Sequence, residues 1–191
     1  MSANQILAVD VTCTPIKWIT VKQAAHYYAS DLIRCAFGTN EFLLNGGTQS
    51  STGLRSQIRV NSIVMVKSQA FAVKHYARPP AVSKPMLLRR DRFMCAYCGG
   101  VFKEHQLEME HIHPASRGGE DSWTNLVAAC NSCNNQKKAR TPEEAKMKLL
   151  YVPYVPNRHE GFILSGRRVL ADQMEFLLAG VPKHSRLHSS T

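Results

Sequence analysis

Two short apolar runs rich in β-branched residues stand out in the first third of the chain. Residues 6–11 read ILAVDV, and residues 57–66 read QIRVNSIVMV. The second run places four apolar side chains on one face of a period-two pattern: Ile58, Val60, Val64 and Val66. Strands repeat every two residues and favour β-branched side chains, so both runs predict β-strands.

Between these runs the pattern indicates one short helix and one turn. Thr20 followed by Gln23 forms a capping box, which predicts a helix over residues 21–28. Residues 45–47 read Asn-Gly-Gly and predict a turn. Residues 1–82 are therefore expected to form a small α+β unit, whose role we leave open between DNA binding and protein interaction.

Proline and helix signals divide the rest of the chain. Three prolines within residues 77–85 predict a linker, because proline removes backbone donors and disfavours helix in the residue before it. Thr141, Pro142 and Glu144 predict a helix to about residue 150, and an apolar stripe predicts a last helix over residues 167–179. The expected division is 1–82, 84–150 and a C-terminal helical extension at 151–191.

Composition places the chain among folded proteins. Hydrophobic residues make up 44% of the chain and charged residues 20%, which argues against wholesale disorder. Its apolar runs are strand-sized and far from the roughly 18 to 20 residues that cross a bilayer. The N-terminal residues do not resemble a secretory signal. We expect a cytoplasmic location, in a bacterial cell or a phage-infected host.

The charge of the chain points to a polyanionic partner. Twenty-four Lys and Arg against 14 Asp and Glu leave a formal charge of +10 and a pI near 9.5, which favours nucleic acid, although a basic surface alone would explain it equally well. Six cations in two clusters are the candidate phosphate contacts: Arg89, Arg90, Arg92, Lys137, Lys138 and Arg140.

Four of the six cysteines fall into two Cys-x-x-Cys pairs. The pairs are Cys95 with Cys98 and Cys130 with Cys133, separated by 31 residues. Two residues between cysteines let both thiolates turn onto one ion, so the pairs predict a closed, structural four-cysteine zinc site. The alternative is a set of redox or unliganded thiols. The remaining two cysteines, Cys13 and Cys35, lack such a partner.

The segment between the cysteine pairs contains the residues suited to catalysis. Residues 107–114 alternate like a strand and contain Glu110 and His111, while a glycine turn leads to a second strand at residues 123–127. The second cysteine pair is expected to open a helix. In a regular strand Glu110 and His111 point to opposite faces, so a shared site requires the chain to bend.

Residues 89–140 closely resemble the HNH nucleases, through CAYC, EHIHP, GGEDSWTNLVAAC and CNSCN. The resemblance implies a ββα-metal module like that of stand-alone bacterial or phage members, with the four-cysteine zinc of many of them. It also implies that His111 is the general base, that Asn125 tethers the loop and orients the histidine, and that Glu110 and Asn134 hold a catalytic divalent metal.

Two positions depart from the common family pattern. Glu110 replaces the frequent Asp, and Asn134 occupies the last position in place of His. Both still offer oxygen ligands, which suit Mg²⁺ first and Mn²⁺ second. The expected fold class is α+β, with the ββα-metal HNH module between the N-terminal unit and a C-terminal helix.

The expected function is metal-dependent hydrolysis of DNA phosphodiester bonds, one strand per active site. Histidine readily exchanges protons near neutral pH, which suits His111 to activate water. RNA as substrate and a homodimer stay open. One alternative is a noncatalytic zinc-stabilised nucleic-acid-binding module, and another is a nuclease subunit of a phage or defence complex. We expect exposure for His113, loop packing for Trp123 and no role for His105.

Overall fold

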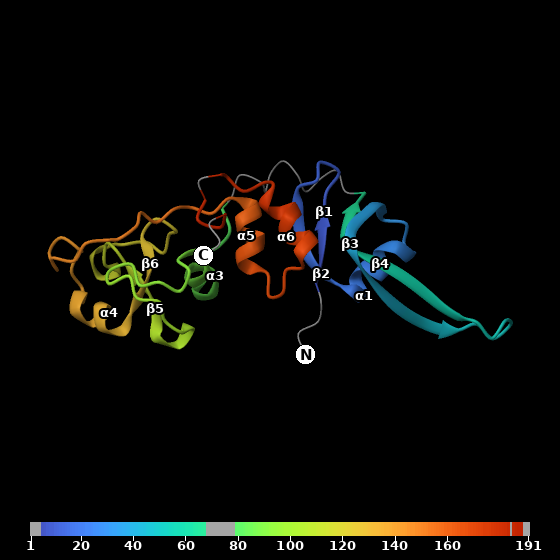
Figure 1. Cartoon of the computed structure of the whole chain (residues 1–191), viewed down its shortest axis with the longest axis horizontal. Helices are drawn as coiled ribbons and strands as arrows, with labels where there is room; N and C mark the ends of the chain where they lie inside the picture. Colours follow the sequence, from blue (N-terminus) through green and yellow to red (C-terminus); the bar gives the residue numbers. More distant parts are fainter. Residues whose placement is uncertain (1–4, 68–78, 184, 189–191) are drawn as a thin grey trace. The chain divides into compact units, whose positions relative to one another are not determined.

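The computed structural model describes residues 5–67, 79–183 and 185–188, drawn in colour in Figure 1. The described residues cluster into two compact units. The first contains residues 5–67 with 166–182, and the second contains residues 79–165 with 183 and 185–188. The architecture is α+β, which confirms the expected fold class.

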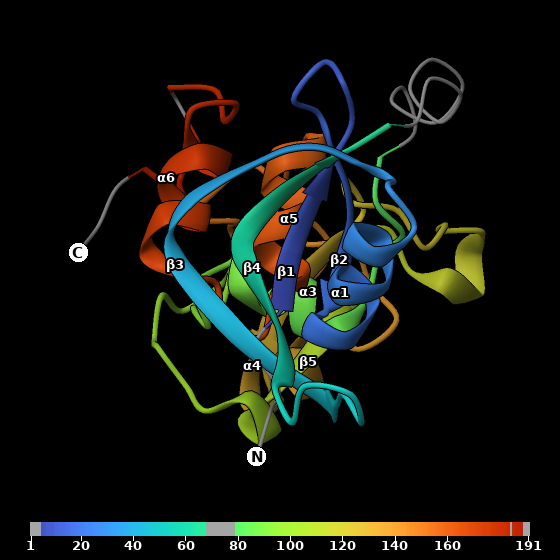
Figure 2. The same cartoon turned by 90° about the vertical axis from the view of Figure 1, so that its right-hand side faces the viewer.

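The first unit contains a four-stranded sheet in the order β2-β1-β4-β3 (Figures 1 and 2). Its strands are β1 (Gln5–Val9), β2 (Pro15–Thr20), β3 (Ile33–Thr48) and β4 (Arg55–Val66). The central pair, β1 and β4, is parallel, whereas β1–β2 and β3–β4 are antiparallel. The two predicted apolar runs are thus the two central strands.

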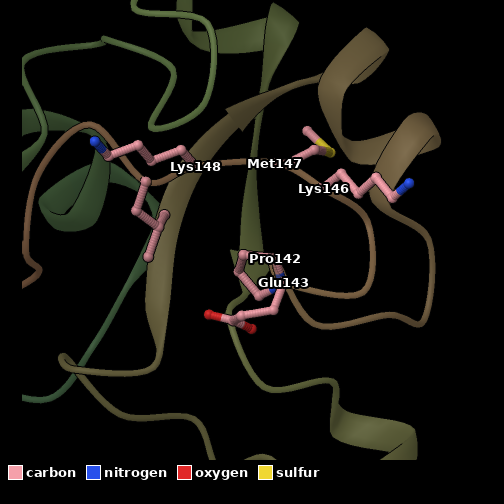
Figure 3. A pocket seen from close by; sticks show the side chains of 6 residues that line it. Pro142, Glu143, Lys146, Met147 and Lys148 are labelled. Carbon is pink, nitrogen blue, oxygen red and sulfur yellow. The ribbon is translucent and has the colours of Figure 1, made fainter.

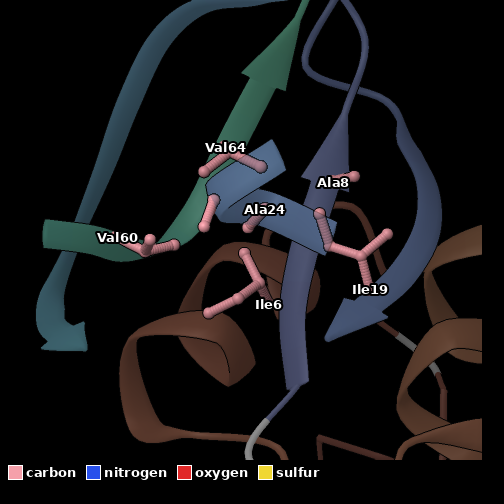
Figure 4. Close-up of a cluster of buried hydrophobic side chains, with 7 residues drawn as sticks. Ile6, Ala8, Ile19, Ala24, Val60 and Val64 are labelled. Atoms are coloured by element: carbon pink, nitrogen blue, oxygen red, sulfur yellow. The ribbon is translucent and has the colours of Figure 1, made fainter. Parts of the chain in front are cut away.

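Helix α1 (Val21–Ala29) covers one face of this sheet. The capping box is present: Gln23 N donates to Thr20 Oγ1, and Thr20 N donates to Gln23 Oε1. Figure 4 shows the core beneath the helix, built from seven buried side chains: Ile6, Ala8, Ile19, Ala24, Ala25, Val60 and Val64. The predicted apolar face of β4 and the predicted helix therefore both form, and the structure packs them against each other.

Helix α6 (Ala171–Leu178) belongs to the first unit, although it lies more than 100 residues from the sheet in sequence. Gln173 Nε2 donates to the carbonyls of Gln5 and Ser62, both at 2.8 Å. Asp172 accepts from Ser62 Oγ at 2.5 Å. The expected extension at residues 151–191 is thus split, because these polar contacts and the buried Leu177 hold residues 166–182 to the sheet unit.

The second unit contains a two-stranded antiparallel sheet followed by a helix. Strand β5 (Leu107–His111) pairs with β6 (Leu126–Cys130), and α4 (Asn131–Lys137) follows directly. This is the expected ββα order, with the second strand shifted from residues 123–127. Its other helices are α3 (Lys84–Arg90), α5 (Arg158–Ser165) and the 3₁₀ turns η1 (Glu104–Gln106) and η2 (Ala115–Arg117).

The prediction of a helix that begins at Thr141 and runs to about residue 150 is wrong. The capping contacts form, since Glu144 N donates to Thr141 Oγ1 and Thr141 N donates to Glu144 Oε2. Lys146 then adopts a left-handed φ of 54°, and residues 142–146 make only turns. Capping chemistry starts a turn, but it cannot extend a helix past a left-handed residue.

The linker region is irregular where it is described. Residues 77 and 78 lie outside the described residues, while residues 79–83 carry no regular secondary structure. No helix among the described residues is long and apolar enough to cross a membrane.

Candidate active site

The two cysteine pairs meet in space. Cys95 and Cys98 lie on a loop, whereas Cys130 ends β6 and Cys133 lies on α4. Their four Sγ atoms all lie within 4.8 Å of one another, and Cys98 Sγ lies 4.0 Å from Cys130 Sγ. Zn–S bonds of about 2.3 Å in a tetrahedron require sulfurs about 3.8 Å apart. The cluster therefore fits one zinc ion closely.

The thiols of the cluster differ in acidity. Burial of Cys95 opposes its ionisation, but backbone hydrogen bonds from Cys98 and Cys130 outweigh it and lower its pKa to about 7. The pKa of Cys133 is raised, first by burial and then by hydrogen bonding to Cys130. Because the pKa of Cys133 is raised, zinc binding would have to release a proton from this thiol.

The loop of the first cysteine pair is tied to the hairpin. Gly99 has a φ of +73°, the left-handed region that favours glycine, and its amide donates to the Cys95 carbonyl at 3.0 Å. The amide of Ala96 donates to the carbonyl of Ala128 in β6 at 2.8 Å. Zinc at the cluster would thus join the loop, the hairpin and α4.

His111 is the last residue of β5, and its imidazole contacts a carboxylate. Nε2 lies 2.8 Å from Asp121 Oδ1. The side chain of His111 is 23% exposed and that of Asp121 is 82% exposed, so the ring is partly sheltered while its partner faces water. An ionised carboxylate can only accept a hydrogen bond, so this contact favours the tautomer with the proton on Nε2 and the lone pair on Nδ1. Sequence reasoning missed Asp121, which appeared there only as part of a glycine turn.

Asn125 ties down the loop between the strands. Its Oδ1 accepts from the amide of His113 at 2.8 Å, and its Nδ2 donates to the carbonyls of His113 and Glu120 at 3.1 and 3.0 Å. Gly119 packs so closely against the carbonyl of His113 that a Cβ at this position would lie 1.9 Å from the carbonyl oxygen. The loop carrying Asp121 is therefore held close to the end of β5.

Two polar contacts join β5 to α4. Glu110 Oε1 accepts from Lys137 Nζ at 2.7 Å, and Glu108 Oε2 accepts from Asn134 Nδ2. Glu108 and Glu110 alternate onto one face of the strand, and residues 134 and 137 lie one turn apart on the helix. Glu108 is a second residue that sequence reasoning missed, although its place two residues before Glu110 was a usable signal.

The structure gives three of the four expected catalytic and metal residues different partners. His111 contacts Asp121, Glu110 contacts Lys137, and Asn134 contacts Glu108. Among the described residues, only the four cysteines form a group of three or more His, Cys, Asp or Glu side chains close enough for one ion. Two carboxylates of β5 do contact α4, one of them through the amide of Asn134, and such oxygens are the donors a hard cation takes.

Two of the six candidate phosphate contacts are corrected, because their side chains are fully buried. Arg90 pairs with Asp91 at 2.8 Å and donates to the carbonyls of Trp123 and Leu126. Lys137 is 0% exposed and pairs with Glu110. A buried cation with its donors already engaged cannot reach a phosphate. Both residues serve the interior of the unit instead.

The other four cations keep exposed surface. Lys138 and Arg140 are exposed, while Arg89 and Arg92 are partly buried. Arg89 donates to the carbonyl of Leu164, and Arg92 to that of Arg186. Arg140 donates to the carbonyls at the end of α4. These four remain proposals for phosphate contact.

Two of the remaining predicted side chains, Trp123 and His113, lie as expected. Trp123 is 3% exposed and donates from Nε1 to the carbonyl of Pro80, so it packs the loop. His105 and His113 are exposed.

One shallow pocket is lined by residues that come after α4 in the sequence, and none of the predicted site residues lines it. It is formed by six side chains, drawn in Figure 3: Pro142, Glu143, Lys146, Met147, Lys148 and Leu149. The two lysine amines point to opposite sides in that view. None of the six is a predicted site residue, so the pocket does not mark the candidate active site.

Comparison with protein families identifies a known domain within the second unit. A family model described as HNH endonuclease matches residues 95–150. The match covers both cysteine pairs, β5, β6 and α4.

Curated relatives match the same region. A CRISPR-associated endonuclease Cas9 of Corynebacterium diphtheriae is 43% identical over 56 residues, which is 29% of this chain and 5% of the relative. The Cas9 of Campylobacter jejuni is 36% identical over 34% of this chain and 7% of its own length. The type IV methyl-directed restriction enzyme EcoKMcrA of Escherichia coli is 31% identical over 41% of this chain and 30% of the enzyme.

The chain thus spans less than a third of each of these relatives. Among solved structures, the type II-C Cas9 enzyme from Actinomyces naeslundii aligns with a TM-score of 0.31 and 21% identity. That alignment covers 62% of this chain and 14% of that enzyme. A superposition at this TM-score does not establish a common fold.

Proposed function

We propose that the HNH endonuclease domain formed by residues 95–150 makes this chain a metal-dependent endonuclease that hydrolyses DNA phosphodiester bonds, one strand per active site. The observation that carries the proposal is the contact between His111 and Asp121 beside the loop that Asn125 tethers. Asp121 holds Nε2, so Nδ1 of the same ring is left to take a proton from an attacking water. His111 is therefore assigned as the general base.

The face between β5 and α4 would hold the catalytic cation. Glu110 Oε2, the second carboxylate oxygen of Glu108 and the amide oxygen of Asn134 are the available donors, since Lys137 and Asn134 Nδ2 engage the other two oxygens. These oxygens favour Mg²⁺ or Mn²⁺. When bound, the cation would polarise the scissile phosphate and stabilise the leaving oxygen.

The four-cysteine cluster is assigned a structural zinc. All four donors are sulfur and the set is complete, so no position is left for water or substrate. Its role is to fix the first cysteine loop, α4, which carries Asn134, and β6, which pairs with the strand that carries Glu108, Glu110 and His111.

DNA is the proposed substrate for two reasons. The matched relatives include CRISPR-associated endonucleases and a methyl-directed restriction enzyme, and restriction acts on DNA. The formal charge of +10 favours any nucleic acid. We place the protein in the bacterial cytoplasm or a phage-infected host, where such a substrate is present.

A cleavage assay tests the function. Full-length protein with Mg²⁺ or Mn²⁺ is expected to nick supercoiled plasmid, and EDTA should stop the reaction. His111→Ala should lower the rate by at least ~100-fold, the scale of general-base catalysis. His105→Ala, which changes an exposed histidine outside the site, should cut like the wild type. Equal rates for both variants would refute the assignment of the base.

One observation favours the second candidate, a noncatalytic zinc module that binds nucleic acid. Glu110 is already neutralised by a buried ammonium, so its carboxylate is satisfied without any metal. In that case the protein would bind DNA tightly, and no metal or substrate form would give cutting. Mn²⁺ titration with a radiolabelled duplex separates the two candidates, because it detects a single nick per molecule.

A further inference from the structure

Strands β3 and β4 continue past the sheet as a two-stranded ribbon. β1 pairs with β4 at residues 63–65. β3 and β4 stay paired from there out to Thr48 and Arg55. Figures 1 and 2 show this pair extending beyond the other strands of the unit. We call residues 45–57 the arm.

Every residue of the arm is exposed. Closer to the sheet the ribbon has a buried side, where Phe42, Leu44 and Ile58 pack against the core. Beyond Asn45 that apolar side ends, and both faces are polar apart from Leu54, which is 69% exposed. An isolated ribbon without a hydrophobic face gains little from its own burial, so the arm is not explained by the stability of the fold.

Hydrogen bonds within the arm give it a defined shape. Gln57 Nε2 donates across the strands to Asn45 Oδ1 at 3.0 Å, and Ser56 Oγ donates to the carbonyl of Gly47 at 3.0 Å. At the tip the amide of Gln49 donates to the carbonyl of Leu54 at 2.8 Å. The contact between the two amides uses Asn45 Oδ1 and Gln57 Nε2, so Asn45 Nδ2 remains as a donor and Gln57 Oε1 as an acceptor on two exposed residues.

The charge of the arm suits a polyanion. No Asp or Glu lies between Glu41 and Asp91 in the sequence. The arm carries Arg55, whose Nε donates to the carbonyl of Gly46, so the guanidinium is held in place by one nitrogen with the others left to donate. Arg59 lies four residues further along β4, nearer the sheet. Its side chain is 80% exposed, and its Nη1 lies 3.9 Å from Glu41 Oε2.

We propose that the arm enters the major groove of duplex DNA. Two strands lie about 4.8 Å apart, and four residues advance about 13 Å, which suits a groove about 12 Å wide and about 8.5 Å deep. Asn and Gln amides pair with adenine edges and Arg with guanine or phosphate. Asn45, Gln57 and Arg55 supply these groups at the end of the ribbon. The arm would thus add base contacts to the phosphate contacts proposed for the second unit.

The inference rests on the proposed function only for the choice of DNA, and its test does not use cutting. Equilibrium binding to a labelled duplex is measured with full-length His111→Ala protein in the absence of Mg²⁺. In this background Arg55→Ala should reduce the slope of log affinity against log salt by about 1, and Gln57→Ala should weaken binding by about tenfold on the best duplex from a selected pool. Lys22→Ala, an exposed cation of α1 in the same unit, is the matched control and should change neither.

Two further binding measurements identify the groove that the arm enters. Duplex DNA with glucosylated 5-hydroxymethylcytosine has a filled major groove and should bind at least about tenfold more weakly. Duplex RNA should also bind weakly, because its major groove is too narrow for side chains. Equal binding to these duplexes, or arm variants that behave like Lys22→Ala, would overturn the proposal. Arm variants that change only the oligomeric state in light scattering would assign the arm to contact between copies and overturn it as well.

The outcomes separate the two proposals. Cutting that depends on His111 together with unaffected binding by arm variants rejects the arm and keeps the nuclease. Binding that depends on the arm without any cutting keeps the arm and rejects the nuclease.

Discussion

The buried ammonium of Lys137 lies 2.7 Å from Glu110 Oε1, on the face where the sequence predicted a metal ligand. Lys137 is fully buried and Glu110 is 14% exposed. The pair therefore ties the carboxylate of β5 to α4 through one of its two oxygens. Removing either partner would leave the other charge buried without compensation.

Lys137→Met should destabilise the second unit by about 3 kcal/mol, because it leaves a largely buried carboxylate unpaired. Urea denaturation followed by tryptophan fluorescence measures the change. Lys138→Met is the matched control, since Lys138 is the exposed neighbour, and it should shift the free energy of unfolding by less than about 0.5 kcal/mol. Adding Glu110→Gln to Lys137→Met should restore part of the loss; a double variant with no recovery would contradict the pairing.

Asp121→Ala should slow DNA cutting by roughly 10-fold to 100-fold, less than His111→Ala, because it removes only the group that orients Nε2. The melting temperature should not change, since an exposed ion pair contributes little to stability. Single-turnover nicking rates measure the effect. Glu120→Ala removes the adjacent exposed carboxylate and should cut normally; similar rates for the two variants would count against an orienting role.

Cys133→Ser should lower the zinc content from about one per chain to near zero and unfold the second unit, since binding and folding are coupled at such sites. Elemental analysis and circular dichroism report both changes. Cys35→Ser, at an exposed cysteine outside the cluster, should retain full zinc. Folded Cys133→Ser protein with bound zinc would show that the cluster is not the zinc site.

Zinc affinity should fall as the pH is lowered. Zinc binds thiolates, and the pKa of Cys98 and Cys133 is raised, so these thiols must lose protons when zinc binds. Backbone hydrogen bonds oppose the burial of Cys95 and lower its pKa to about 7, so below about pH 7 one more proton has to be displaced. A competition titration with a chelating dye should therefore show a steeper loss of affinity below pH 7 than above it. A pH-independent affinity would contradict thiolate ligation.

Asp172→Asn should destabilise the first unit at pH 7 by roughly 1 to 2 kcal/mol. Burial opposes ionisation of Asp172, but hydrogen bonds from Ser62 Oγ and the amide of Asn40 outweigh it and lower its pKa. A lowered folded pKa means that this stability is present above the unfolded value near ~3.9 and is lost as the pH falls through the folded value.

Hydrogen exchange of β4 amides measures this effect within the first unit. The protection of β4 amides in the wild type should decrease as the pH falls below about 4, whereas Asp172→Asn should show no such decrease. Asp31→Asn changes an exposed carboxylate that pairs with Lys67 and should follow the wild type. Identical pH profiles for Asp172→Asn and the wild type would refute the role of this carboxylate.

The strongest predictions came from residues whose signal is local. The capping box at Thr20 and the apolar alternation in residues 57–66 depend on neighbours within a few positions, and both elements formed as expected. The cysteine spacing is equally local, because each Cys-x-x-Cys turn presents two sulfurs by itself. Local signals failed where the next residues decided the outcome, as at Lys146, whose left-handed backbone stopped a well-capped turn from becoming a helix.

The sequence by itself determined the α+β class, the zinc-type cluster and the HNH module, because these depend on short-range spacing and residue type. Only the tertiary structure decided the partners of the charged residues. Arg90 and Lys137 look like surface cations in sequence, yet Asp91 and Glu110 neutralise them in the interior. The physical reason is that burial of a charge depends on which opposite charge the fold brings within hydrogen-bonding distance, and for Lys137 that partner lies 27 residues away in the chain.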